Sequence, residues 1–334
     1  TKYPTWKDRN KIFKMLNNYQ IILLIAPPGC GKTVIVPKLM SHYFKYKKKI
    51  IITTPRQKTT KSAAGYAAFL LDVPSPVPNN DTDADNNAKN KGYKKPDDVI
   101  KYVGYKYKNA TEYDKYTKLL YSTDGSIKVM MTSKDPDLKD YAGIIIDEAH
   151  ERNINIDILL KFIIELCNRR PDFKVIIMSA TVDPAIFISY FKRLNILDKF
   201  AMYNPEGIPS NYKITKEFAS NKNIKPDDVI KIVQEKVDNI LKDNTIMDKI
   251  FSEENNTEKG KFMKYGRDIL IFLPTVAKCK DAKKFIDDNY NKGFYKYKPY
   301  IIIFTKNTVG LESEIAIDKG GLDKIEGAND YQFK

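Results

Sequence analysis

The chain has 334 residues, with 57 lysines and arginines against 42 aspartates and glutamates, and a formal net charge of +15. This length favours two domains that each bury a core of their own, and the basic charge favours a polyanionic partner. The three cysteines lie far apart without CxxC spacing, and no apolar run reaches membrane-spanning length, which argues against a disulfide framework, a structural zinc site and a membrane partner.

After an amphipathic lead-in helix over residues 3–18, residues 20–40 read QIILLIAPPGCGKTVIVPKLM. The apolar run Ile21–Ile25 predicts a buried strand, the glycines after it predict a turn, and the spacing from Val34 to Met40 predicts a helix. A strand, a glycine turn and a Lys-Thr pair that opens a helix are typical of a phosphate-binding loop. We expect Lys32 to meet the β- and γ-phosphates and Thr33 to ligate Mg²⁺. The expected nucleotide-binding residues are Gly29, Cys30, Gly31, Lys32, Thr33 and Val34.

The next part of the chain alternates between apolar runs and polar segments. We expect a strand over 49–53, a helix over 58–71 and a flexible insertion over 73–98, which is rich in proline, asparagine and aspartate. Residues 101–121 are rich in tyrosine and lysine, a composition that suits either base stacking or an ordinary strand. A turn over 122–125 and a strand over 127–131 are expected to follow.

The second informative segment, residues 141–160, reads YAGIIIDEAHERNINIDILL. Three isoleucines, 144–146, predict a buried parallel strand that ends at Asp147 and Glu148. Ligands of open α/β sheets bind at this edge, so we expect Asp147 to hold Mg²⁺ and Glu148 to polarise the attacking water. Residues 175–178 predict a further strand, which is followed by Ser179.

The second half of the chain carries weaker signals. The sequence predicts an amphipathic helix over 227–242, a polar insertion over 244–266, a strand followed by a loop within 268–275, and a strand over 299–304. These elements are too few for a whole second sheet, so a partial second domain is expected.

Residues 20–200 resemble the first RecA-like domain of superfamily 2 helicases, in particular the DEAH-box RNA helicases. The segments APPGCGKT, TTPRQ, VGY, STDG, DEAHER and SAT occur in the order of that family. The resemblance implies an α/β fold, in which a RecA-like P-loop NTPase domain with a parallel sheet (1–200) precedes a partial second RecA-like domain (201–334). It also implies an RNA helicase or translocase that uses ATP or another NTP with Mg²⁺, and that binds single-stranded RNA, with DNA as the alternative.

The resemblance also implies roles for further residues. His150 would couple the nucleotide site to the other domain, Ser179 and Thr181 would relay domain closure, and Tyr66 stands where the family has an arginine that stacks on the base. Contacts with the nucleic-acid backbone, which carry little sequence information, are implied for Thr54, Pro55, Arg56, Thr123, Asp124, Gly125, Pro274 and Thr275.

The arginines depart from the family pattern. After Arg193 the sequence holds only Arg267, which lies outside any segment resembling the family's arginine fingers. Such a finger is worth about 10³–10⁵ in rate. We therefore expect slow hydrolysis by residues 1–334 alone, with the fingers supplied by a longer chain or by a protein partner. The alternative is a non-catalytic nucleotide- and nucleic-acid-binding or assembly protein derived from a helicase.

The location of the protein is expected to be intracellular and cytoplasmic. The lysine-rich composition also fits an AT-rich coding genome, such as that of a large DNA virus. A virion or a viral factory is the expected location in that case.

Overall fold

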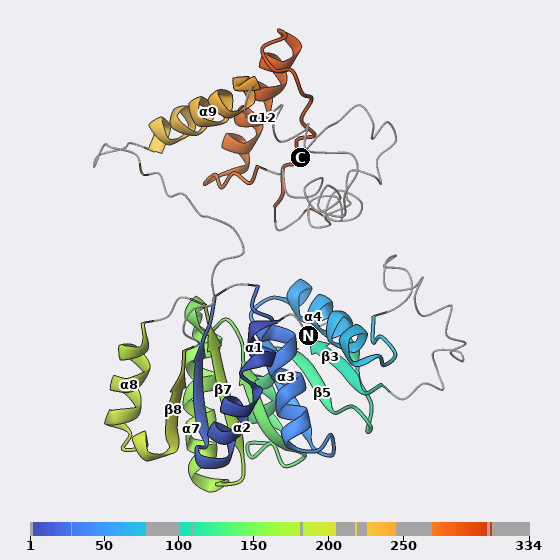
Figure 1. Cartoon of the computed structure of the whole chain (residues 1–334), viewed down its shortest axis with the longest axis vertical. Coiled ribbons are helices and arrows are strands. Elements are labelled where there is room, and N and C mark those ends of the chain that lie inside the picture. The colour runs from blue at the N-terminus through green and yellow to red at the C-terminus, as the bar shows by residue number, and fades with distance from the viewer. Residues whose placement is uncertain are drawn as a thin grey trace. The chain divides into compact units, whose positions relative to one another are not determined.

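The computed structural model describes residues 3–27, 29–77, 101–108, 110–180, 183–204, 218, 226–244, 269–305 and 308. The chain forms two compact units, Thr1–Ile214 and Thr215–Lys334 (Figure 1). The predicted division after residue 200 stays a prediction. The predicted insertions fall largely outside the described residues.

The first unit alternates strands with helices. Its strands are β1 (Ile21–Ile25), β2 (Lys49–Thr54), β3 (Val103–Tyr107), β4 (Ala110–Glu112), β5 (Leu119–Thr123), β6 (Tyr141–Ile146), β7 (Lys174–Ser179) and β8 (Phe200–Tyr203). Its α-helices are α1 (Pro4–Lys7), α2 (Arg9–Asn18), α3 (Lys32–Tyr43), α4 (Gln57–Leu71), α6 (Asp124–Ser133), α7 (Ile154–Arg169) and α8 (Pro184–Arg193). Two short 3₁₀ helices are η2 (Ala149–Glu151) and η3 (Leu197–Lys199).

The strands form one sheet in the order β4-β3-β5-β2-β6-β7-β1-β8. Neighbouring strands are parallel, with the exception of the antiparallel pair β3 and β4. Leu23 of β1 lies opposite Ile177 on one side and Met202 on the other. Because the strands are parallel, the segments that follow β1, β6 and β7 all emerge at the same edge of the sheet.

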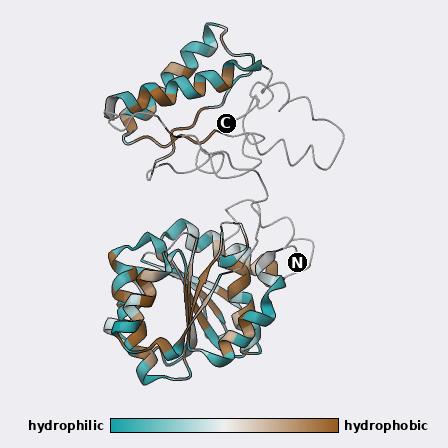
Figure 2. Ribbon diagram, turned by 60° about the vertical axis from the view of Figure 1, so that its left-hand side comes forward, coloured by the Kyte–Doolittle hydropathy of each residue, from teal (hydrophilic) through white to brown (hydrophobic). Residues whose placement is uncertain are grey.

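Helices cover both faces of this sheet, so the central strands are apolar on both sides. Successive side chains of a strand point to opposite faces, and the core divides accordingly. Ile22 and Leu24 pack with α2, α3 and α4, whereas Ile21 and Leu23 pack with α6, α7 and α8. Figure 2 shows hydrophobic residues along the strands and hydrophilic ones on the outer faces of the helices.

Most of the elements expected in this unit are confirmed, including the strands at 21–25, 49–53, 144–146 and 175–178. The lead-in helix is divided into α1 and α2 at Asp8. The turn expected over 122–125 and the strand over 127–131 are wrong, because α6 begins at Asp124 and continues to Ser133. Ile127 and Met131 are buried four residues apart, a spacing that fits one face of a helix.

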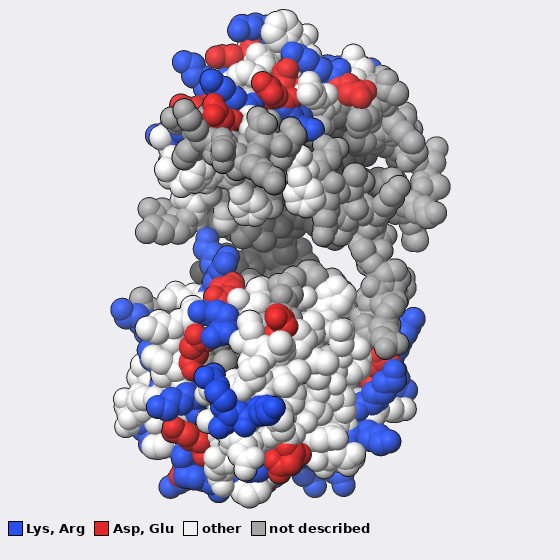
Figure 3. Space-filling view, turned by 90° about the vertical axis from the view of Figure 1, so that its left-hand side faces the viewer, with Lys and Arg blue, Asp and Glu red and all other residues white. Residues whose placement is uncertain are grey.

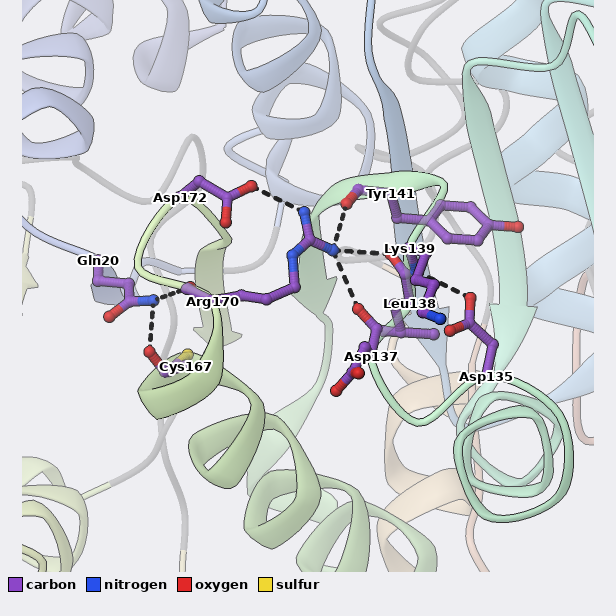
Figure 4. Close-up of polar contacts among 9 residues, drawn as sticks. All are labelled: Gln20, Asp135, Asp137, Leu138, Lys139, Tyr141, Cys167, Arg170 and Asp172. Carbon is purple, nitrogen blue, oxygen red and sulfur yellow. Dashed lines mark hydrogen bonds and ion pairs between the residues drawn. The ribbon is translucent and has the colours of Figure 1, made fainter.

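One arginine holds the loop between α6 and β6 in place (Figure 4). Nη1 of Arg170 donates to the carbonyl oxygens of Asp137, Leu138 and Tyr141 at 3.0, 2.8 and 2.9 Å. Its Nη2 donates to Asp172 at 2.8 Å. The planar guanidinium can satisfy several acceptors at once, and Leu138 needs this support because its backbone is left-handed, with φ of 45°.

The second unit contains α9 (Pro226–Lys242) and α12 (Val276–Asn291), which confirms the helix expected over 227–242. Val237 and Leu241 of α9 pack with Ile286 of α12 and with Tyr295. The hydroxyl of Tyr295 donates to Asp238 at 2.7 Å.

The strand expected within 268–275 and the strand expected over 299–304 are wrong for the residues that the structure describes, since 269–275 and 300–304 lack strand structure and Pro299 forms only a single β-bridge. A strand needs a hydrogen-bonded neighbour. Leu270 and Phe272 are 77% and 84% exposed, so these apolar side chains are not in a core. Within the described ranges, no helix has the length and hydropathy needed to cross a bilayer.

We expect Arg170→Met to lower the free energy of unfolding by about 2–3 kcal/mol, because three loop carbonyls lose a charged donor. Chemical denaturation of the whole chain measures the change. Arg193→Met is the matched control, because Arg193 is exposed, and it should stay within about 0.5 kcal/mol of wild type. Equal losses in the two variants would contradict the role assigned to Arg170.

Candidate active site

The loop after β1 curls back toward the start of α3. The backbone N–H of Ala26 donates to the carbonyl of Ser179 at 3.0 Å, which ties the loop to the end of β7. Gly29 and Gly31 have φ of +78° and +88°, a region that favours glycine. A Cβ on Gly31 would also lie 2.8 Å from the ring of Tyr3, so both the backbone and the space require glycine there.

Lys32 is the first residue of α3, and it is only 6% exposed. Its ammonium donates to the carbonyl oxygens of Ala26 and Pro27 at 2.7 and 3.1 Å. The charge therefore lies within the loop at a helix N-terminus, where an anion is stabilised by the backbone N–H groups.

Asp147 follows β6 directly and is 1% exposed. Burial, the largest cause, and the nearby charge of Glu148 both raise the pKa of its carboxyl, whose net value is about 6 instead of 3.8. A hydrogen bond with the Thr33 side chain and the positive charge of Lys32 lower this pKa. The first helical turn after the loop and the end of β6 thus meet at one buried carboxylate.

The hydroxyl of Thr33 and the carboxylate of Asp147 are hard oxygen donors, which are the ligands that Mg²⁺ prefers. Mg²⁺ is commonly held by one or two protein oxygens together with phosphate oxygens and water, so this pair fits the ion. Among the described residues, no group of three or more His, Cys, Asp or Glu side chains is placed to hold a metal.

A second carboxylate lies beside the first but reaches solvent. The side chain of Glu148 is 37% exposed, and its backbone is left-handed with φ of 53°. Nδ1 of His150 lies 3.3 Å from Oε2 of Glu148 and 3.3 Å from Oγ of the buried Ser179. The structure therefore brings three predicted residues into one chain of contacts, while Thr181 lies outside the described residues.

The residues predicted to contact nucleic acid differ in their access to solvent. The side chain of Arg56 is 75% exposed and pairs with Glu151 at 3.2 Å. Thr54 is buried, and its hydroxyl is hydrogen-bonded to that of Thr60 at 2.6 Å. Asp124 is 2% exposed, and the prediction that this residue contacts nucleic acid stays a prediction. Burial raises the pKa of this carboxyl, and hydrogen bonds with neighbouring side chains lower it.

The remaining predicted residues of this group lie on two separate units. Pro55 is half-buried beside Arg56, and Thr123 is half-buried with its hydroxyl 2.9 Å from that of Ser126. Gly125 is in the first turn of α6. Pro274 and Thr275 belong to the second unit, where the Thr275 hydroxyl caps α12 by accepting from the N–H of Lys278.

The N-terminal segment contacts the predicted phosphate-binding loop, and no pattern in the sequence indicates this contact. The ring of Tyr3 lies against Gly31, and its hydroxyl is 2.8 Å from that of Tyr66. The hydroxyl of Thr5 donates to the carbonyl of Cys30 at 2.7 Å. Tyr66 is 45% exposed and stacks on Phe69, with ring centroids 6.1 Å apart. Cys30 is buried, and Val34 is 9% exposed, so both pack in the core beneath the loop.

Comparisons with known proteins bear on the first unit. The family described as type III restriction enzyme, res subunit, matches residues 5–183. A protein of Acanthamoeba polyphaga mimivirus, provisionally named an ATP-dependent RNA helicase, is 35% identical over 197 residues, which are 58% of this chain and 25% of that protein. The ATP-dependent RNA helicase HrpA of Borreliella burgdorferi is 32% identical over 59% of this chain and 21% of its own length.

Among solved structures, the Escherichia coli DEAH/RHA helicase HrpB matches with a TM-score of 0.59 at 19% identity, over 95% of this chain and 33% of that one. This likeness confirms the RecA-like fold. The chain spans about a quarter or less of the length of the two relatives named first. With the family match over residues 5–183, the chain belongs to the family of the res subunit of type III restriction enzymes, as a DEAH-like member of helicase superfamily 2.

Proposed function

We propose that the chain forms the nucleotide-binding part of an ATP-dependent RNA helicase or translocase. In this proposal the loop from Gly29 to Thr33 holds the phosphates, and Thr33 and Asp147 hold Mg²⁺. Glu148 orients the attacking water, and His150 with Ser179 transmits the state of the nucleotide. When bound, Mg²⁺ would neutralise charge that develops on the transferred phosphoryl group.

The observation that carries the proposal is the buried cluster of Lys32, Thr33 and Asp147. A carboxylate that is 1% exposed opposes folding at neutral pH, because burial disfavours its charged form. A structural role would be served equally by a neutral side chain. Retaining the charge beside a lysine and a hydroxyl is what a Mg·nucleotide site requires.

Nucleotide binding without turnover is the second candidate function. Residues 194–334 contain one arginine, Arg267, so this part of the chain offers few candidates for an arginine finger. A lysine lacks the planar fork that grips two phosphate oxygens. The two candidates share nucleotide and RNA binding and differ in turnover, which phosphate release with and without RNA measures.

The distribution of charge does not indicate where RNA binds, so the position of the proposed RNA surface is inferred from individual residues. Figure 3 shows one face of the first unit on which basic and acidic side chains are interspersed beside a broad uncharged area. The backbone of RNA would lie near Arg56, near Thr123 at the end of β5 and near Gly125 in the first turn of α6. Such contacts serve any sequence.

Lys32→Ala should weaken binding of Mg·ATP at least about tenfold, because a charged donor to the phosphates is lost. Isothermal titration calorimetry with the whole chain measures this. Lys45→Ala, just beyond the far end of α3, is the matched control and should bind as wild type does. Equal affinity in wild type and Lys32→Ala would refute the proposed phosphate site.

Asp147→Asn should stabilise the nucleotide-free protein at pH 7.5 while it abolishes Mg²⁺-dependent nucleotide binding. The folded-state pKa of about 6 exceeds the unperturbed 3.8, so the charged carboxylate opposes folding by up to about 3 kcal/mol. The stability gap between variant and wild type should be small near pH 4, widen as pH rises to about 6, and stay constant above it.

Thermal unfolding between pH 4 and pH 8 measures that gap. Asp157→Asn is the control, because Asp157 is exposed and accepts from Arg152 at 2.7 Å. It should bring no gain in stability. A gap for Asp147→Asn that does not change with pH would contradict the assigned cost of burial.

Single-stranded RNA should bind with little sequence preference and with affinity that falls steeply with salt, because phosphate contacts release counterions. Arg56→Gln should weaken binding and reduce the slope of log K against log salt by about 0.7, the value for one phosphate. Arg193→Gln should leave the slope unchanged. Affinity that is independent of salt, measured by fluorescence anisotropy, would contradict the proposed surface.

A further inference from the structure

Glu151 joins the proposed RNA surface to the proposed catalytic segment. Its Oε1 accepts from Nη2 of Arg56 at 3.2 Å, across segments that are far apart in the sequence. Three quarters of the Arg56 side chain is exposed, so its guanidinium is accessible from solvent while it is paired. The Glu151 side chain is only 29% exposed and has less freedom to move away.

Glu151 is the last residue of η2, and His150 precedes it in the same short helix. His150 in turn contacts Glu148, the proposed water-orienting residue, and Ser179. The segment is bounded by two left-handed residues that are not glycine, Glu148 with φ of 53° and Arg152 with φ of 44°. Such backbone persists where surrounding contacts hold it, and the pair between Arg56 and Glu151 is one of the contacts that this segment makes.

The start of α6, which is the second segment proposed to contact RNA, lies beside the residues that follow η2. Nδ2 of Asn155 lies 3.6 Å from the position that a Cβ of Gly125 would take, and Lys128 of α6 donates to Oδ1 of Asn155 at 2.7 Å. Asn153 caps α7 by accepting from the N–H groups of Asn155 and Ile156. The start of α6 is therefore packed against the start of α7, directly after Arg152.

We propose that Glu151 is a positioning residue that links RNA binding to the catalytic segment: it holds Arg56 without RNA, and an RNA phosphate that pairs with Arg56 releases it. This inference rests on the proposed function. An exposed ion pair is weak, and guanidinium binds a phosphate through two parallel hydrogen bonds. RNA therefore displaces Glu151 at small cost, and η2 is freed from one of its fixed contacts when RNA arrives.

The test measures the affinity of the whole chain for a fluorescein-labelled single-stranded oligouridylate by anisotropy. Glu151→Gln should tighten binding about two- to fivefold, because the competitor for Arg56 is lost. In the Arg56→Gln background, Glu151→Gln should give a clearly smaller gain in RNA affinity, since no guanidinium is left to release. Asp157→Asn, which removes an equal charge from another arginine pair nearby, is the matched control and should give no more than this residual effect.

A second readout separates positioning from a local charge effect. RNA should change the affinity of wild type for Mg²⁺ with a non-hydrolysable ATP analogue, and this coupling should fall at least about twofold in Glu151→Gln. An equal gain in RNA affinity with and without Arg56, or unchanged coupling, would overturn the inference while the proposed function stands. Wild type that binds no RNA would overturn both.

Discussion

The burial of one carboxylate, Asp147, is the interaction on which the arrangement of this site depends. Burial raises the pKa of this carboxyl, whereas Thr33 and Lys32 lower it, and the net value is about 6. Because Thr33 and Lys32 both lower this pKa, the charge of the carboxylate depends on its two neighbours, and the three side chains form a single electrostatic unit. Lys32 also donates to the carbonyls of Ala26 and Pro27, so its ammonium links the first helical turn to the loop before it.

The sheet is what makes this unit possible. Buried isoleucine-rich strands, covered on both faces, deliver the loop after β1 and the acidic turn after β6 to one edge, with β7 between them. Only parallel strands place these segments together, because antiparallel neighbours would send every second turn to the opposite edge. The hydrogen bond from the N–H of Ala26 to the carbonyl of Ser179 is an example, since it ties the loop after β1 to the end of β7.

Much of the fold could be predicted from the sequence because its signals are strong and local. Runs such as Ile21–Ile25 are too short for a helix and too apolar for a surface, and the structure has them as strands. For residues 127–131 the sequence is ambiguous, because a short apolar run fits both the strand period and the helix period. The burial of Ile127 and Met131 on one face of α6 is evident only from the fold. The apolar run 269–273 was also expected to contain a strand, but an apolar sequence does not by itself provide the neighbouring strand that a sheet requires.

The same distinction applies to the residues of the site. The contiguous motifs Gly29 to Thr33 and Asp147 to His150 could be placed from the sequence, because each follows a strand that fixes its position. The contact of Tyr3 with Gly31 and the pair of Arg56 with Glu151 could not, because they join segments by tertiary packing. Arg56 is close to η2, and η2 carries His150. The proposed RNA surface and the proposed nucleotide segment are therefore joined through one short helix, since η2 contains both the partner of Arg56 and His150.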